Sequence, residues 1–351
     1  MSAPGPNEVL IRNRAVALNP FDRIVQTLGG LVTPWLDYPC ILGSDVAGEV
    51  VAVGTGVSRF KPGDRVAGLA LGVDKVSNRP AEGAFQHYVL LREDATTAIP
   101  EAMSFERAAV LPLAIATAAS GLFLADQLGL ERPRHPASGR RDGTVIVWGG
   151  STSVGSCAIQ LARAAGYDVA TTASPRNFEH VRRLGASLAF DYRDPAVMAH
   201  MTDALRGRQV VGALAIGAGS GKACIELVRR AGGRRIVSMA SAPLPLDGAP
   251  LGSQRAWKLA TLPRLALGFA GLALRARLAG VTVRSLWGTA LVKDELGRHI
   301  FRDFLGPALA QGVVVPAPEP LVSGHDLRDI PAAMELLRRG VSARKIVVAL
   351  G

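Results

Sequence analysis

Residues 144–240 constrain the fold most strongly, because short apolar segments alternate there with longer segments of helical periodicity. The apolar segments are TVIVW, DVATTAS, LAFDY, VVGALAI and RRIVSMAS. Repeated strand-helix units of this length predict a parallel sheet with helices on both faces. Strands covered on both faces must be nearly all apolar, and these segments are. We therefore expect an α/β region with a doubly wound parallel sheet.

The first hundred residues follow a different pattern, in which short β-branched runs alternate with Gly, Pro and Asp turns. Runs 8–18 and 45–57 predict short strands in an antiparallel, barrel-like arrangement. The period becomes helical after Ser104, and residues 131–143 form a connector rich in Pro, Gly and charge. A chain of 351 residues is also too long for one core, so we expect two domains with a boundary near residue 118.

Composition excludes several function classes. Cys40, Cys157 and Cys224 lie far apart without a C-x-x-C pair, which argues against a disulfide framework or a thiolate zinc site. The net charge of +11 is spread along the chain with only 4 Trp and 4 Tyr, so we expect no nucleic-acid partner. The sequence has no run of about 18 uncharged apolar residues and no signal peptide, which predicts a cytoplasmic protein without a membrane span.

The stretch VWGGSTSVG, residues 147–155, follows an apolar strand and opens an amphipathic helix. A dinucleotide-binding turn needs a strand, free backbone amides, a small residue at the helix contact and a helix N-terminus aimed at the pyrophosphate. Gly149 and Gly150 supply the turn, although the G-x-G-x-x-G spacing is missing. The predicted cofactor-binding residues are Ser151, Thr152, Ser153, Val154 and Gly155, and the three hydroxyls offer further phosphate hydrogen bonds.

The end of the next strand indicates which cofactor binds. NAD-binding turns place an acidic residue there for the ribose hydroxyls. Here the end reads TTASPRNF, with Ser174, Arg176 and Asn177 and no acid. Because Ser174 and Arg176 suit a 2′-phosphate that a carboxylate would repel, the sequence favours NADPH.

Several motifs together resemble one family. They are LNPFD at 18–22, GSDVAGEVVAVGTGVSRFKPGDRV at 43–66, the WGGSTSVG turn, AFDYR at 189–193, TTASPRNF and SARKIVVAL. The chain resembles the medium-chain dehydrogenase/reductase superfamily over nearly its whole length. Within that superfamily it is similar to zinc-free quinone oxidoreductases and to the trans-acting enoyl reductases of polyketide pathways.

The resemblance implies a Rossmann cofactor domain inserted into a GroES-like, mostly β catalytic domain. We expect the catalytic domain over 1–118, the Rossmann domain over 119–288 and the completing part of the catalytic domain over 289–351. In family members, a further segment that forms the first strand pair precedes the equivalent of residue 8. This start therefore implies either a misplaced start codon or a trimmed barrel.

The resemblance also shows which zinc ligands are missing. Asn19 stands where zinc-binding members have their first Cys, and Gly43, Ser44 and Asp45 stand at their G-H-E motif. Residues 72–83 replace the lobe that holds four Cys, and the six His residues show no metal-ligand spacing. We therefore predict no metal, and a hydride acceptor that is already electrophilic: a carbonyl-conjugated alkene or a quinone.

By resemblance, Asn19 and Asp22 lie beneath the nicotinamide, and Thr117 lies at the substrate pocket. The Asn19 amide and the Thr117 hydroxyl are candidate donors to the substrate carbonyl or the ribose. A turn cap or salt bridge is an equal alternative for Asp22. The Lys that enoyl reductases often carry two residues after this Asp is Ile24 here, so no proton donor is identified.

Later strand ends complete the predicted cofactor site. Tyr192 is expected at the adenosine 2′-phosphate, with a core tyrosine as the alternative. Ile216, Gly217 and Trp287 fall where nicotinamide contacts cluster in such sheets.

Three functions stay open from sequence. They are an NADPH-dependent, zinc-independent reductase of alkenes or quinones, a trans-acting enoyl reductase serving an acyl carrier domain, and a non-enzymatic NADPH-binding protein like the lens crystallins. Segment 255–284 holds six basic residues and no acidic one. We expect a core-facing helix pair interrupted at Pro263, with a cover over the substrate site or a docking face for an acidic carrier as alternatives. A homodimer is an expectation from the family.

Overall fold

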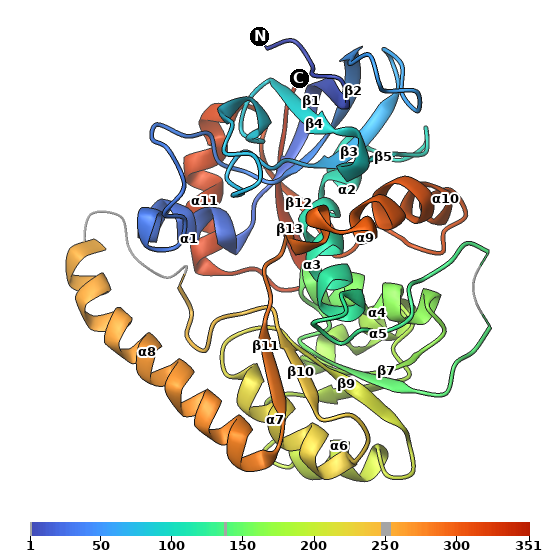
Figure 1. Cartoon of the computed structure of the whole chain (residues 1–351), viewed down its shortest axis with the longest axis vertical. Coiled ribbons are helices and arrows are strands. Elements are labelled where there is room, and N and C mark those ends of the chain that lie inside the picture. Colours follow the sequence, from blue (N-terminus) through green and yellow to red (C-terminus); the bar gives the residue numbers. More distant parts are fainter. Residues whose placement is uncertain (1, 137–138, 247–253) are drawn as a thin grey trace. The chain divides into compact units, whose positions relative to one another are not determined.

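The computed structural model describes residues 2–136, 139–246 and 254–351, without the side chains of 254–256 and 258. The chain divides into one unit of Met1–Ala116 with Val292–Gly351 and a second unit of Thr117–Leu291. Each unit contains its own sheet (Figure 1). The boundaries expected near 118 and 288 lie a few residues from these.

The second unit contains a six-stranded sheet in the order β11-β10-β9-β6-β7-β8, and every neighbouring pair is parallel. Its strands are β6 (Thr144–Trp148), β7 (Asp168–Ala173), β8 (Leu188–Asp191), β9 (Val210–Ala215), β10 (Ile236–Met239) and β11 (Thr282–Ser285). The chain reverses direction across the sheet between β6 and β9, so the expected doubly wound sheet is confirmed. Because all strands are parallel, their carboxyl ends lie along one edge.

Helices cover both faces of this sheet, with α4 and α5 on one face and α6 and α7 on the other (Figure 1). They are α4 (Ser153–Ala164), α5 (Phe178–Arg183), α6 (Val197–Ala204), α7 (Ser220–Ala231) and α8 (Gln254–Ala279). The apolar faces of α6 and α7 pack with the sheet into one core, which includes Met201, Ile225 and Val237. Cys157 and Cys224 are both buried, as expected for reduced thiols.

The first unit contains a mostly antiparallel sheet, ordered β12-β13-β1-β2-β3-β5 with β4 paired to β1. Its strands are β1 (Glu8–Ala17), β2 (Asp45–Val53), β3 (Arg65–Leu69), β4 (Tyr88–Arg92), β5 (Thr96–Ala98), β12 (Glu319–Gly324) and β13 (Arg344–Ala349). The C-terminal strand β13 pairs with β1, so residues far apart in sequence complete one sheet. The mostly β catalytic domain completed by the C-terminal segment is therefore observed.

Short helices surround this sheet. They are α1 (Pro20–Leu28), α2 (Phe105–Ala109), α9 (Glu295–Arg298), α10 (Leu305–Ala310) and α11 (Ile330–Arg339). Ser104 caps α2 by accepting the amide of Arg107, at the place where the sequence predicts that a helix begins. Helix α3 (Pro112–Phe123) carries the chain from the first unit into the second.

The structure differs from expectation at segment 255–284. Pro263 does not end the helix, and α8 runs unbroken from Gln254 to Ala279 before β11 begins. Over 259–279 only Leu272 and Ala276 are buried. The expected core-facing helix pair is wrong, because an apolar composition does not determine how many faces of a helix find a packing partner.

Candidate cofactor and catalytic site

The turn after β6 has the backbone geometry that a phosphate-binding turn requires. Gly149 has φ +91°, a left-handed conformation that favours glycine. A Cβ on Gly155 would lie 2.2 Å from the carbonyl oxygen of Gly149, and one on Gly150 would lie 2.1 Å from Oγ1 of Thr171. Larger residues would therefore push α4 away from the strand.

The hydrogen bonds of this turn show which amides and hydroxyls are already paired within the protein and which are available to a ligand. The hydroxyl of Thr152 donates to the Gly149 carbonyl and accepts the amide of Gly155, so it caps α4. The amides of Ser151, Ser153 and Val154 form no hydrogen bond with any described residue. Unpaired amides at the start of a twelve-residue helix, together with the helix dipole, favour a phosphate group there.

The carboxyl end of β7 lies beside this turn in the sheet. Ser174 follows β7 directly and is buried, and its carbonyl accepts the amide of Asn177. Arg176 lies in the same short turn with its side chain exposed. The turn therefore presents a cation to solvent and no carboxylate.

The remaining predicted cofactor residues follow β8, β9 and β11 along the same edge. Tyr192 is 42% exposed, and the guanidinium of Arg193 lies over its ring, which adds a second cation near this end of the sheet. Ile216 is nearly buried, and the amide of Gly217 donates to the hydroxyl of Ser241. Trp287 is half-buried after β11. The parallel sheet thus collects these residues along one edge, and their contacts with a cofactor stay a prediction.

The first unit holds a buried polar network around Asp45. One carboxylate oxygen of Asp45 lies 2.9 Å from Nζ of Lys345 and accepts Nδ2 of Asn19 at 2.8 Å. Its other oxygen accepts the amide of Leu113 at 2.6 Å. Lys345 also donates to Oδ1 of Asn19. Asp45 is fully buried and the other two side chains are about 5% exposed, so the pair is shielded from water.

Asp22 lies one helical turn beyond Asn19. Its Oδ2 accepts the backbone amide of Asn19, which holds the start of α1. Its Oδ1 is buried and forms no ordinary hydrogen bond with a described residue. Burial is the largest cause that raises the pKa of Asp22 to about 7, and the negative charge of Asp45 adds to it. The hydrogen bond from the Asn19 amide and, less strongly, the charge of Lys345 act in the opposite direction.

Thr117 is the first residue of the second unit and is buried in α3. Asn19 has both ends of its amide committed to Asp45 and Lys345, which leaves one Nδ2 hydrogen for a ligand. The roles of Asn19 and Thr117 as donors to a substrate stay predictions.

The residues that the resemblance places at the zinc ligands of other members do not fit zinc. An amide, a hydroxyl and a carboxylate stand there, and the ammonium of Lys345 already contacts the carboxylate and the amide. Zinc requires deprotonated or imidazole ligands in a tetrahedral arrangement. Within the described residues no group of three or more His, Cys, Asp or Glu could hold a metal ion.

Sequence reasoning missed Lys345 and Ser241. Lys345 lies in SARKIVVAL, a stretch that carried the family resemblance, but a lysine near a strand start usually faces solvent. The available signal was a positive charge inside an otherwise apolar C-terminal strand. Ser241 has no comparable signal, because its partner, the Gly217 amide, belongs to another loop.

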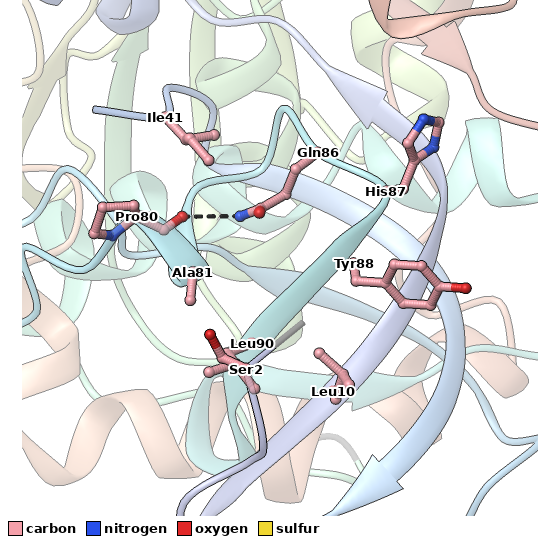
Figure 2. Close-up of a pocket in the computed structure, with 9 residues that line it drawn as sticks. All are labelled: Ser2, Leu10, Ile41, Pro80, Ala81, Gln86, His87, Tyr88 and Leu90. Atoms are coloured by element: carbon pink, nitrogen blue, oxygen red, sulfur yellow. Dashed lines mark hydrogen bonds between the residues drawn. The ribbon is translucent and has the colours of Figure 1, made fainter. Parts of the chain in front are cut away.

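A cavity of about 370 Å³ lies elsewhere in the first unit, at the start of β1 and at β4 (Figure 2). None of the predicted site residues lines it. The Gln86 amide at its wall already donates to the carbonyls of Pro80 and Gly83. The cavity is therefore separate from the network around Asp45.

We predict that Lys345→Met destabilises the protein by about 3–5 kcal/mol, because it leaves the Asp45 charge buried without a partner. The measurement is urea unfolding of the full chain. Arg14→Met is the matched control: Arg14 pairs with Glu49 at 2.9 Å with both side chains partly exposed, so it should cost about 0–1 kcal/mol. Adding Asp45→Asn to Lys345→Met should recover part of the loss. Equal, small losses in both single variants would contradict the account.

Asp22 should make stability depend on pH. Its folded pKa of about 7 lies above the ordinary aspartate value of 3.8, so the folded state binds this proton more tightly than the unfolded state. The free energy of unfolding therefore falls as pH rises from about 4 to 7. Each pKa unit is worth about 1.4 kcal/mol, so Asp22→Asn should gain several kcal/mol relative to wild type between pH 4 and 8. Denaturant unfolding at each pH tests this, and parallel curves for the two proteins would refute it.

Comparisons with known proteins agree with this architecture. The family described as alcohol dehydrogenase GroES-like domain matches residues 5–101. The dehydrogenase pigH of Monascus ruber is 46% identical over 99% of this chain and 93% of its own length. The trans-enoyl reductase himH of Aspergillus japonicus is 36% identical over 98% of this chain and 90% of its own length.

A solved structure of Escherichia coli quinone oxidoreductase complexed with NADPH has the same fold. Its TM-score is 0.69 at 20% identity, and the match covers 99% of this chain and 93% of that one. The full-length relatives, the GroES-like match and the two observed units agree. The chain therefore belongs to the medium-chain dehydrogenase/reductase superfamily.

Proposed function

We propose that this protein is an NADPH-dependent, zinc-independent oxidoreductase that reduces an activated alkene or a quinone. The observation that carries the proposal is the ammonium of Lys345 in contact with Asn19 and Asp45, two residues that stand where the resemblance would place metal ligands. Without a Lewis acid to polarise an alcohol or ketone oxygen, the acceptor must already be electrophilic. A C=C bond conjugated to a carbonyl, and a quinone, both meet this condition.

The carboxyl edge of the parallel sheet supports the choice of cofactor. The unpaired amides of Ser151, Ser153 and Val154 suit a pyrophosphate, and the exposed guanidinium of Arg176 suits a 2′-phosphate. When bound, NADPH supplies the hydride. The chain binds the cofactor, orients the acceptor and stabilises negative charge on its carbonyl oxygen.

The polar network around Asp45 suggests how the chain orients its hydrogen-bond donors. Lys345 and Asp45 fix the Asn19 amide from both ends, so its orientation is set before substrate binds. Asp22 is wholly buried and holds the backbone of Asn19. We therefore assign Asp22 to positioning and leave the donor role to Asn19 and Thr117.

Trans-acting reduction of a carrier-bound enoyl chain is the second candidate. Its support is the 36% identity to a protein named trans-enoyl reductase. The two candidates share the hydride step and differ in whether the acceptor arrives free or attached to a protein.

Arg176→Ala should weaken NADPH binding by about 10–100-fold and leave NADH binding nearly unchanged, because it removes a charge-assisted hydrogen bond to the 2′-phosphate. Calorimetric titration of both cofactors measures this. Arg182→Ala is the matched control, because Arg182 is exposed on the neighbouring helix and its guanidinium lies over Phe178. Equal weakening of both cofactors by Arg176→Ala would refute the 2′-phosphate assignment.

Turnover on a defined set of acceptors tests the reaction itself. NADPH oxidation is followed with quinones, enones, a free enoyl thioester and the same enoyl group on a carrier domain. The leading proposal predicts turnover of a free acceptor. Turnover of the carrier-bound acceptor alone would favour the trans-acting enzyme, and binding of NADPH without turnover of any acceptor would contradict both.

A further inference from the structure

Helix α8 exposes large apolar side chains that do not pack against the rest of its unit. Leu259, Leu267, Leu274 and Leu278 are between 59% and 80% exposed. We refer to these four residues as the leucine ridge. The opposite face of α8 packs against the protein, because Leu272 and Ala276 are buried in the core of the second unit. In Figure 1, α8 runs along the flank of this unit beside α7.

The spacing of three of these leucines places them on one face of α8. Leu267, Leu274 and Leu278 are separated by seven and then four residues, which places them on one helix face. Leu272 is five residues after Leu267 and so lies on the other side of the helix. Leu259 lies about 80° around the helix from Leu267, so it flanks this face, and the exposed leucines together extend about 30 Å along the helix. Helix α8 therefore has two apolar faces, of which the fold covers one.

Charges beside the ridge are of one sign. Arg264, Arg275 and Arg277 are exposed on α8, and the sequence contains no acidic residue between Asp247 and Asp294. None of the three arginines forms an ion pair with a residue in the described part of the chain. In contrast, Arg229 and Arg230 of α7 both pair with Glu226 of their own helix. The ridge therefore lacks both an apolar partner and counter-charges.

This combination limits what can cover the ridge. A second copy packed ridge to ridge would bring arginines together without a carboxylate from either α8. An apolar layer under a negatively charged surface provides both missing elements.

We propose that α8 binds the surface of a membrane containing anionic phospholipid. The helix lies parallel to the surface, with the leucine ridge at the acyl boundary and the arginines at the headgroup phosphates. Residues 259–279 are apolar and long enough to cross a membrane by composition, but burial of Leu272 and Ala276 in the protein core keeps α8 attached to its unit. The helix therefore lies on the membrane and does not span it.

Vesicle flotation of the full chain tests the proposal without any turnover assay, so the result is independent of the reductase reaction. Wild type should bind vesicles that contain phosphatidylserine far more strongly than pure phosphatidylcholine vesicles. In the variant L267S/L274S/L278S the partition coefficient should fall by more than about 100-fold, because each substitution removes apolar surface that the leucine would bury in the membrane. Leu31→Ser is the control, since Leu31 is 60% exposed but lies in the first unit.

The arginines are tested separately. R264Q/R275Q/R277Q should weaken binding to the anionic vesicles by roughly fivefold per residue, and added salt should reduce wild-type binding. R183Q/R206Q/R339Q changes the net charge equally at exposed arginines outside α8. Thermal unfolding confirms that each variant is folded.

Three results would overturn the proposal. One is wild-type protein that stays unbound to both kinds of vesicle. Another is equal loss of binding in the two arginine variants, which would indicate nonspecific attraction of a basic protein. The third is a dimer, detected by light scattering, that the leucine variant converts to a monomer, which would make the ridge an interface between copies.

Discussion

The buried carboxylate of Asp45 connects distant parts of the first unit. Through it, strand β2 contacts the start of α1 at Asn19, the start of α3 at Leu113 and the C-terminal strand at Lys345. These contacts span more than 300 residues of sequence, since Asn19 and Lys345 are 326 positions apart. A buried charge of this kind requires its partners, so the network fixes the relative positions of the groups at the proposed catalytic site.

The same network limits the chemistry. A cation of fixed position is present, but it is an ammonium already bonded to protein groups, and it cannot polarise a substrate oxygen as a metal would. The proposed reduction therefore uses an acceptor that is electrophilic by itself and oriented hydrogen-bond donors. In the second unit, the carboxyl edge of the parallel sheet is where we propose that the cofactor binds. It offers amides at the α4 N-terminus that pair with no described residue, and a cation after β7.

Local sequence patterns predicted the elements whose physics is local. The apolar strands of 144–240 gave a parallel sheet because their burial on both faces is visible in composition, and Gly149 and Gly155 marked a turn that admits no Cβ. Ser104 was predictable as a cap from its position alone. These features depend on neighbours within a few residues.

Features that depend on tertiary partners were missed. Lys345 is buried only because β13 pairs with β1 and brings it to Asp45, a contact that no local pattern encodes. Periodicity identified 255–284 as apolar and basic, but it could not show that one face of α8 would stay uncovered. The predicted interruption at Pro263 failed because one missing hydrogen bond does not outweigh the turns on either side.

The most direct test of a metal-free reductase is isotope transfer by metal-stripped protein. The chain is dialysed against chelator, its metal content is measured, and it is incubated with an enone or enoyl thioester and NADPH deuterated at the transferring position. The account predicts that one deuterium is transferred to the carbon β to the carbonyl. The chelator-treated protein, with far less than one metal ion per chain, should transfer it at the same rate as the untreated protein. Loss of deuterium transfer on chelation, with recovery on adding zinc, would contradict it.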